Sequence, residues 1–422
     1  MNIDIHHITR VEGHGRLVVD VKNKKIEKIE MQVTEGTRLF EAWLRNRRYD
    51  EVTHLACRIC AICSASHTVS SLKAVENAFG INISDQTRKL RELAVLGEYI
   101  QSHVLHMYCL ALPDYLGFES VISMAEKYPD EVKNALKMKK LGNDIAEVAA
   151  GRAVHQISAV VNGFTKIPGR DELEKLLKKI EELRPAAVKT IELFSGLDYP
   201  ELERKTEYIA LKNSDDYAIY DGKIASTEGW NADVKNWEKS TTEQIVEYSN
   251  AKQGIRNGHG YMTGPLARVN LNFEQMSGTV KDAAKDNDVS FPSYNPFHNN
   301  VARSLELLHC FDRTINIIEN NSFRKEKNEY KIKPGEGYGA NEAPRGTLYY
   351  HYGIDEKGIV TSANILTPTA QNLKNIEEDV NAFLPKILEE SKEKIIQNLE
   401  MLVRAYDPCI SCAAHFLTVE FV

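Results

Sequence analysis

The chain has 422 residues, which by length alone suggests two or three domains, although a single catalytic body can absorb this length. Hydrophobic residues make up 42% and charged residues 27%, as in ordinary soluble globular proteins, and the net charge of −7 argues against non-specific nucleic-acid binding. No apolar run is long enough to span a membrane, and the N-terminus lacks the apolar core of a signal peptide. We therefore expect a cytoplasmic protein with no membrane span, although such a chain can also be exported with a partner that carries a signal.

The N-terminal region is predicted to form strands. Residues 15–21 are rich in β-branched side chains, residues 25–33 alternate between apolar and polar, and Asn23-Lys24 is the expected turn between them. Helical periodicity then dominates. It predicts helices at 68–79, at 85–112 with Asp85 as N-cap, at 130–161 and at 171–194.

The second half of the chain mixes short and long elements. Residues 207–293 hold many Gly, Asn and Asp residues and indicate short strands, short helices and loops. Periodicity further predicts a helix at 301–319, strands at 330–366 with Gly335, Gly337 and Gly339 in a turn, and two helices at 372–405 that break near Pro385. The predicted fold is mainly α (α+β), with a central bundle of long helices, small peripheral β-sheets and one body spanning residues 1–422.

Five of the seven cysteines fall in two clusters near opposite ends of the chain, Cys57 to Cys63 and Cys409 to Cys412. The odd number and the absence of an export signal argue against a disulfide framework. Cys60-Ala-Ile-Cys63 and Cys409-Ile-Ser-Cys412 each place two residues between cysteines, so both sulfurs of a pair can face one metal. Four thiolates suffice for tetrahedral zinc, an iron–sulfur cluster or a softer transition metal.

Spacing alone favours structural zinc at these cysteines, because such sites are common. Two features count against it. The pairs are separated by almost the whole chain, and each is followed by a histidine, His67 or His415, close enough to interact with the site. A redox dithiol is a weaker interpretation, since nothing suggests a thioredoxin-like unit.

The flanking residues resemble one known family, the large subunits of nickel–iron hydrogenases. The resemblance rests on four segments, which occur in the family's order from residue 8 to the end: Ile8–Gly15 (ITRVEGHG), Arg58–His67 (RICAICSASH), Glu342–Gly346 (EAPRG) and Asp407–His415 (DPCISCAAH). Shorter segments resemble the cytoplasmic multimeric members, and among these most closely the archaeal-type sulfhydrogenases that exchange electrons with NADP(H): Glu35-Gly36, Phe40-Glu41, Leu112–Tyr115 and Ala405–Pro408.

The resemblance assigns the four motif cysteines to a nickel–iron centre. It implies that Cys60, Cys63, Cys409 and Cys412 bind nickel, and that Cys63 and Cys412 also bridge to an iron that carries cyanide and carbon monoxide. Thiolates are soft donors that suit several nickel oxidation states. Cys409 is the expected proton acceptor among them. Cys57 lies outside the family's pattern and is expected to be a buried thiol or one close to the site.

Charged residues are expected around this centre. Arg345 resembles the arginine that lies over the nickel–iron bridge, and Asp114 and Asp407 resemble the carboxylates that orient it. Glu12 matches a glutamate that relays protons from a nickel thiolate. Three of the four also have a plain interpretation: a surface salt bridge for Arg345, a turn residue for Asp407 and an ion pair with Arg10 for Glu12.

Further residues are assigned by the resemblance to cofactor contacts and to a second metal site. His67 matches a histidine that hydrogen-bonds a bridging thiolate, its alternative being an exposed histidine at a helix start. The segment Thr367-Pro368-Thr369 resembles the one that contacts an iron-bound cyanide, with Thr369 as the donor, or else it is a helix N-cap before Asn372. Pro344 is expected to contact the cofactor as well. The expected ligands of a second metal, magnesium or iron, are Glu41, His415 and the Ile365 carbonyl.

The implied function is reversible heterolytic cleavage of H2, with electrons leaving through other subunits. An iron–sulfur small subunit is an expected partner, because this chain has no cysteines left for a series of iron–sulfur clusters. Flavin and iron–sulfur electron-transfer subunits that reach a soluble acceptor such as NAD(P) are expected as well, because this chain has no GxGxxG loop for a nucleotide. The resemblance implies that a maturation endopeptidase removes residues 416–422 from a precursor, since the family's chains are cut after the second motif; the alternatives for this tail are that a natural variant skips the cut and that the tail forms a strand at a sheet edge. The alternatives are a structural zinc protein and a relative of the complex I subunit that has lost the metal. The retained cysteines argue against the latter.

Overall fold

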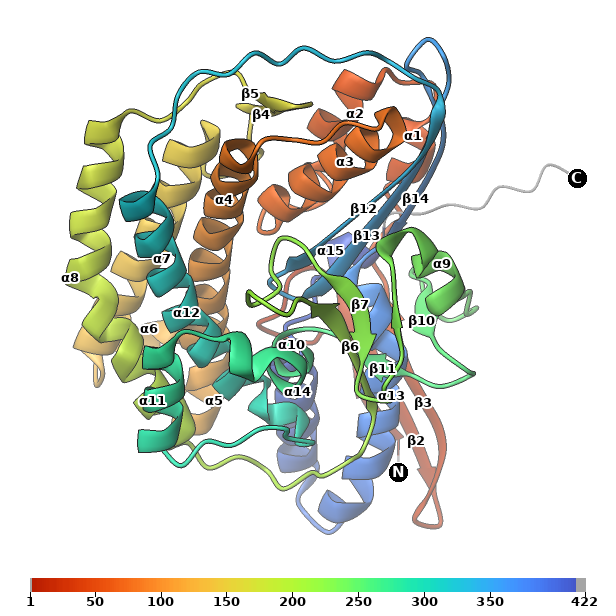
Figure 1. The fold of residues 1–422 in the computed structure, drawn as a ribbon. Coiled ribbons are helices and arrows are strands. Elements are labelled where there is room, and N and C mark those ends of the chain that lie inside the picture. Colours follow the sequence, from red (N-terminus) through yellow and green to blue (C-terminus); the bar gives the residue numbers. More distant parts are fainter. Residues whose placement is uncertain (1, 415–422) are drawn as a thin grey trace, which may run out of the picture.

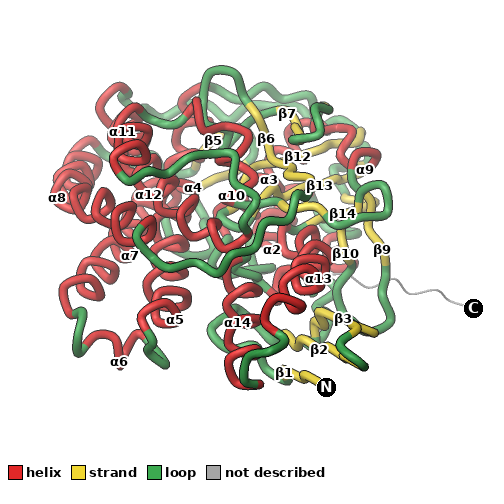
Figure 2. Tube along the Cα trace, turned by 90° about the horizontal axis from the view of Figure 1, so that it is seen from below, coloured by secondary structure: helices red, strands yellow, loops and turns green. Residues whose placement is uncertain are grey.

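Four long helices pack side by side and form one side of the molecule (Figure 1). They are α4 (Asp85–Val104), α7 (Pro129–Ala150), α8 (Arg170–Ser195) and α12 (Asn299–Asn320). The structure, a computed structural model, describes residues 2–414. Most of the strands gather on the other side of the molecule (Figure 2). The predicted mainly α fold with small sheets is confirmed.

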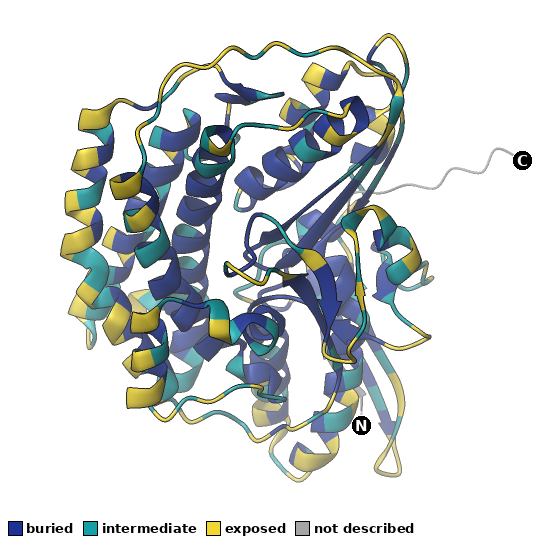
Figure 3. Ribbon diagram, viewed as in Figure 1, coloured by how far each residue is buried: buried dark blue, intermediate teal, exposed yellow. Residues whose placement is uncertain are grey.

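Apolar periodicity explains how these helices pack. In α8, Leu173, Leu176 and Ile180 recur at helical spacing and are buried, whereas the opposite side of the helix is exposed (Figure 3). Within the described residues, no helix has the length and apolar character that crossing a membrane requires.

Helix α4 continues through a wider turn, η1 (Leu105–Ala111), into the short helix α5 (Leu112–Leu116). Pro113 explains the widening, because it lacks an amide hydrogen and its ring crowds the carbonyl four residues earlier. The sequence predicted helix up to Leu112 but not this π-helical turn. The turn carries His106, which faces the candidate site described below.

A three-stranded antiparallel sheet lies at the centre, in the order β12 (Gly335–Ala343), β13 (Gly346–Ile354) and β14 (Val360–Leu366). Helix α3 (Ser64–Phe79) packs against β12 and β13. The prediction that Gly335, Gly337 and Gly339 form a turn was wrong, because all three lie in β12. A side chain at Gly337 or Gly339 would collide with backbone carbonyl oxygens of α3, so these glycines permit the close approach of helix and strand.

Alternation along β13 places the central sheet between two hydrophobic cores. Leu348, Tyr350 and Tyr352 join the core that includes α3 and α4, whereas Tyr349 joins the core that includes α13 (Pro368–Ile387). The second cysteine motif meets both cores, since Cys409 and Cys412 belong to the first and Ile410 to the second.

The predicted N-terminal hairpin is confirmed as β2 (Gly15–Lys22) and β3 (Lys25–Val33), with Asn23 and Lys24 at positive φ in the turn. A further strand, β1 (Asn2–Ile5), pairs with β2.

The region 207–293 consists of short elements as expected. The remaining elements are α1 (Phe40–Leu44), α2 (Tyr49–Ala56), α6 (Val121–Ala125), β4 (Ala159–Val160), β5 (Gly163–Phe164), β6 (Glu207–Lys212), β7 (Lys223–Ser226), β8 (Asn231–Ala232), η2 (Val234–Asn236), α9 (Trp237–Ser240), β9 (Thr242–Gln244), β10 (Gln253–Ile255), β11 (Tyr261–Met262), α10 (Pro265–Asn272), η3 (Phe273–Gln275), α11 (Gly278–Asp286), η4 (Pro296–His298), α14 (Lys392–Ala405) and α15 (Ile410–Ala413).

Two helix boundaries differ in position from the prediction. The helix expected at 130–161 ends at Ala150, because Gly151 adopts a left-handed conformation and terminates it. The break expected near Pro385 falls after Ile387, since Pro385 is tolerated within the last turn of α13. The tail at 416–422 and His415 lie outside the described residues.

Candidate metal centre

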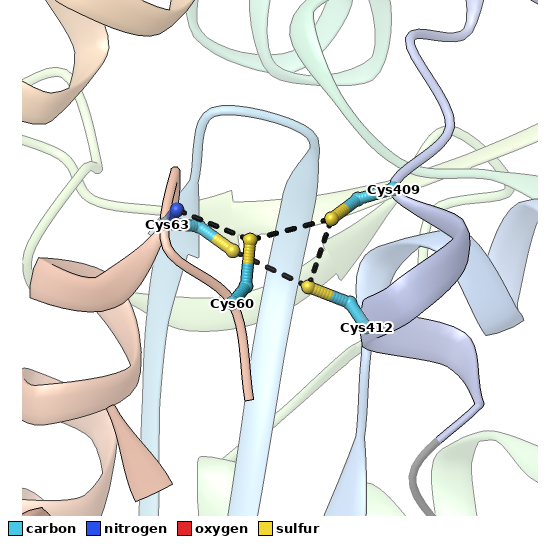
Figure 4. Close-up of side chains that lie close together, drawn as sticks. All are labelled: Cys60, Cys63, Cys409 and Cys412. Carbon is cyan, nitrogen blue, oxygen red and sulfur yellow. Dashed lines mark hydrogen bonds between the residues drawn. The ribbon is translucent and has the colours of Figure 1, made fainter. Parts of the chain in front are cut away.

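The four motif cysteines meet in one buried cluster, although two come from each end of the chain (Figure 4). Cys60 and Cys63 lie in the loop before α3, and Cys409 and Cys412 lie at α15. The Sγ atoms are 3.3 Å apart for Cys60 and Cys409, 3.4 Å for Cys63 and Cys412, and 3.0 Å for Cys409 and Cys412. All four lie within 4.8 Å of one another, which is compact enough to surround metal ions.

Hydrogen bonds tie the two cysteine loops to each other. The Arg38 guanidinium donates through Nη2 to the Ile59 carbonyl at 2.6 Å and also to the Ser411 carbonyl, so one side chain joins the first loop to the second. The Ile410 amide donates to the Glu12 carbonyl at 3.0 Å. The N-terminal segments therefore hold both loops in place through polar contacts made within the protein.

Burial opposes the charge that four thiolates would carry. Burial raises the pKa of Cys412 to about 11, and hydrogen bonding to the Cys412 thiol raises the pKa of Cys409. Hydrogen bonds from the neighbouring thiols lower the pKa of Cys60 well below its ordinary value. A cluster that favours one thiolate and resists the others requires a cation to ionise fully, and soft sulfur donors suit nickel, iron and zinc.

Arg345 lies beside these sulfurs, in the tight turn between β12 and β13. Its Nε donates to the Asp407 carbonyl at 2.9 Å, and its Nη2 donates to the Asp407 carboxylate at 3.1 Å. Burial alone would lower the pKa of Arg345, but Asp407 and the neighbouring cysteines raise it above its ordinary value. The side chain is buried, so Arg345 is not a surface ion pair but a fixed positive charge at the site.

Several neighbouring groups keep the Asp407 side chain ionised. Burial alone would raise the pKa of Asp407, but Arg345 and His106 hold it well below its usual range. His106 Nδ1 lies 3.1 Å from the Asp407 carboxylate and its own pKa is lowered to about 4 by burial. Asp407 therefore orients Arg345 and is more than a turn residue before Pro408.

Asp114 does not orient Arg345, contrary to expectation. Its carboxylate pairs with Arg10 and with Arg404. The wide turn η1 precedes α5 and places Asp114 against the N-terminal segment and α14. Spacing along a helix could not predict this, because the π-helical turn changes which face a residue occupies.

Glu12 contacts the cluster directly. The Cys409 thiol donates to the Glu12 carboxylate at 3.1 Å, and the Ser411 amide donates to the same oxygen at 3.0 Å. The alternative ion pair with Arg10 is not formed in the described part of the chain, since Arg10 pairs with Asp114. A carboxylate that shares a hydrogen bond with a thiol is well placed to accept its proton.

His67 is buried and meets the cluster from α3. Its Nε2 lies 3.8 Å from the Cys412 sulfur, and its Nδ1 lies 2.6 Å from the Tyr350 hydroxyl. The alternative of an exposed histidine is therefore wrong. Tyr350 comes from the central sheet, so the sheet orients the ring that faces Cys412.

Polar groups on the β14–α13 connection complete the surroundings. The Thr369 hydroxyl accepts from the Cys409 amide at 2.9 Å, which leaves its proton available to another acceptor. Thr367 is the N-cap of α13, yet its buried hydroxyl caps nothing and has no partner among the described residues. A buried polar atom without a partner is what a site for a polar cofactor group would leave. Pro344 lies in the turn next to Arg345, and its carbonyl accepts from Arg268 at 2.9 Å.

Two of the expected ligands of the second metal lie together. The Ile365 amide donates to the buried Glu41 carboxylate at 2.9 Å. The third, His415, lies outside the described residues. Cys57 is buried but outside the four-thiol cluster, and its thiol donates to the His54 carbonyl at 3.3 Å.

Sequence reasoning missed Arg38, His106 and Glu98, which touch the loops or charges of the site. Arg38 follows Glu35-Gly36 and His106 lies in a predicted helix, but neither belongs to a pattern that indicates a function by itself. Only the packing of segments far apart in sequence brings them to the cysteines.

Comparisons with known proteins agree with this geometry. The family model of the nickel-dependent hydrogenases matches residues 38–162 and 201–415. Sulfhydrogenase 1 subunit alpha of Pyrococcus furiosus is 37% identical, over 98% of this chain and 97% of its own length. Sulfhydrogenase 2 subunit alpha of the same organism is 35% identical, over 99% of this chain and 100% of its own length.

Solved structures share the fold. An NAD+-reducing [NiFe]-hydrogenase in its H2-reduced state superposes with a TM-score of 0.84 at 25% identity, covering 98% of this chain and 99% of the other. A Ni-Fe-Se hydrogenase of Desulfovibrio vulgaris Hildenborough has the same fold, with a TM-score of 0.80, 21% identity and coverage of 98% and 99%. The chain therefore belongs to the nickel-dependent hydrogenase family and is a catalytic hydrogenase subunit.

Proposed function

We propose that this hydrogenase subunit cleaves H2 reversibly into protons and electrons at a nickel–iron centre held by Cys60, Cys63, Cys409 and Cys412. The observation that carries the proposal is the buried four-thiol cluster with a fixed guanidinium and a carboxylate in contact with it. Structural zinc needs neither a charged arginine nor a proton acceptor beside its ligands, whereas heterolytic chemistry uses both.

In this proposal Cys60, Cys63, Cys409 and Cys412 would hold the nickel, and Cys63 and Cys412 would also serve as ligands of an iron that carries cyanide and carbon monoxide. When bound, the centre supplies the metal ions at which H2 is split heterolytically. The Thr369 hydroxyl, whose oxygen accepts from Cys409, is free to donate to an iron ligand. The unpartnered Thr367 hydroxyl supports a polar group in the same region.

The protein's own groups then hold and move the proton. Cys409 is the proposed proton acceptor, and the Glu12 carboxylate at 3.1 Å is the proposed next carrier. Asp407 fixes the Arg345 guanidinium so that its charge is directed at the cluster without reorganisation. His67 is proposed to stabilise the Cys412 sulfur by hydrogen bonding.

A second metal, magnesium or iron, is proposed at Glu41, His415 and the Ile365 carbonyl. The contact between Glu41 and the Ile365 backbone supports the proposal that these two residues are ligands of the same metal. Oxygen and imidazole ligands suit either ion.

Electrons are proposed to leave through an iron–sulfur small subunit. The three cysteines outside the cluster, Cys57, Cys109 and Cys310, form no metal-binding group among the described residues. The relatives are named as alpha subunits, which supports a multi-subunit assembly, and one similar structure is an NAD+-reducing enzyme. We further propose that flavin and iron–sulfur subunits carry the electrons to NAD(P) as the soluble acceptor. The assembly is proposed to lie in the cytoplasm.

The whole chain, residues 1–422, is proposed to act as one catalytic body, from which a maturation endopeptidase removes residues 416–422. Metal analysis tests the central proposal. Nickel and iron in the purified complex, with infrared bands of bound cyanide and carbon monoxide, are expected. Zinc alone would overturn the proposal in favour of a structural site, and a chain without metal would favour a complex I-like relative.

A further inference from the structure

Helix α3 begins directly at a cysteine of the metal cluster, and this leaves its N-terminus without a local cap. The N-cap position is Cys63, where helices usually carry Ser, Thr, Asp or Asn to accept hydrogen bonds from the first amides. Cys63 forms no such bond, because its sulfur points to Cys412 at 3.4 Å (Figure 4). The first amide groups of α3 therefore need an acceptor from elsewhere.

Glu98 of the neighbouring helix α4 supplies that acceptor. Its carboxylate accepts from the Ala65 amide at 2.6 Å and from the Ser66 amide at 3.3 Å, and it also accepts from the Ser66 hydroxyl. Both carboxylate oxygens take part. A negative group at a helix N-terminus is further favoured by the helix dipole.

Glu98 is an acidic residue at a buried position, where acidic residues are rarely found without partners. Glu98 is 3% exposed, and burial raises its pKa to about 8 despite the hydrogen bonds that it accepts. Buried positions are usually occupied by apolar side chains, as at Leu93 and Leu96 on the same helix. The bonds to α3 offset the cost of burial.

We propose that Glu98 is a positioning residue that caps α3 in place of Cys63, which frees the Cys63 thiol to serve as a metal ligand. Any local N-cap side chain would have to replace that thiol. With the cap supplied by α4, the loop from Cys60 to Cys63 keeps its conformation before a metal is bound. This inference rests on the proposed role of Cys63, although the capping itself does not.

The test uses the full purified chain without metal, as wild type and as the variants Glu98→Ala, Glu98→Gln and Glu92→Ala. Glu92 is a matched control, since it is a buried carboxylate on the same helix that pairs with Arg313 at 2.6 Å. Two quantities are measured: amide hydrogen exchange at Ala65 and Ser66, and the affinity for Ni²⁺ from thiolate-to-nickel absorption.

Glu98→Ala is expected to speed exchange at Ala65 and Ser66 by about 5- to 10-fold, the effect of losing one cap. It should weaken Ni²⁺ binding by roughly 10- to 100-fold, as loss of an outer hydrogen bond to a ligand segment does. Glu98→Gln keeps an acceptor oxygen and should restore most of both quantities. Glu92→Ala should change neither of them.

Unchanged exchange in Glu98→Ala would overturn the proposal, and so would an equal change in Glu92→Ala. If Glu98→Ala does not fold, Glu98→Asp replaces it, because withdrawal of the carboxylate by one methylene should still expose both amides. Exchange as slow as wild type in that variant would also overturn the proposal. A wild-type chain that binds no Ni²⁺ but shows the capping effect would refute the proposed metal site and leave the capping intact.

Discussion

The contact between Cys409 and Glu12 allows proton transfer to be tested separately from folding. Glu12→Gln preserves the size of the side chain and an oxygen that can accept from the Ser411 amide, now 3.0 Å away. The amide of glutamine cannot take up the proton of the Cys409 thiol, which the carboxylate meets at 3.1 Å. The substitution therefore removes the ability of residue 12 to accept a proton and keeps most of the structure.

The expected magnitude follows from these two contacts. One neutral hydrogen bond is retained and one is weakened, so the free energy of unfolding should fall by no more than about 1 kcal/mol. A general acid or base contributes about 10²- to 10⁴-fold to a rate, which corresponds to roughly 3–5 kcal/mol of activation free energy. H2-dependent reduction of a viologen dye by the nickel-loaded complex should fall by that factor.

Glu35→Gln is the matched control. Glu35 also contacts Ser411, but through the hydroxyl at 3.0 Å, and no contact with a sulfur of the cluster is found in the described structure. It should retain most of the dye reduction. The reasoning would be refuted if Glu12→Gln kept more than about a tenth of the activity at full nickel content, or if Glu35→Gln lost as much.

Three further predictions concern the metal and the loops. Cys63→Ser should abolish stoichiometric nickel binding, measured by metal analysis, whereas Cys57→Ser should retain it; nickel loss in both would place Cys57 in the site. Arg38→Ala should lower the free energy of unfolding in urea by about 3 kcal/mol, because two backbone carbonyls lose a charged donor, while Arg48→Ala at an exposed ion pair should change it little. Intact mass of the nickel-loaded chain should show loss of the residues after His415, and a mature chain that still ends at the final residue would contradict the cleavage.

Local patterns predicted the elements whose stability comes from their own apolar faces. Helix α8 was found within one residue at each end, because its buried leucines recur at helical spacing. The hairpin of β2 and β3 was found from alternation and its turn. The glycines of β12 were misread as a turn, because the reason for them is the backbone of α3, more than 250 positions earlier in the chain.

In the candidate site, too, some features could be predicted from short segments and others depend on contacts with distant parts of the chain. The cysteine motifs, Arg345 and Glu12 could be named from short segments with a distinctive order of residues. Asp114 belonged to such a segment too, yet its partners are Arg10 and Arg404, because the π-helical turn before it decides the direction in which it points.

The sequence by itself determined the residue types of the candidate site: four soft ligands in two pairs, an arginine and a carboxylate, a set that by spacing alone also suits structural zinc. It also determined the long helices, since helical periodicity is a local property. The tertiary structure alone decided that Arg38 joins the two cysteine loops and that Glu98 caps the helix that begins at Cys63. These contacts join segments that are distant in the chain, and no local pattern records which buried polar groups will share a hydrogen bond.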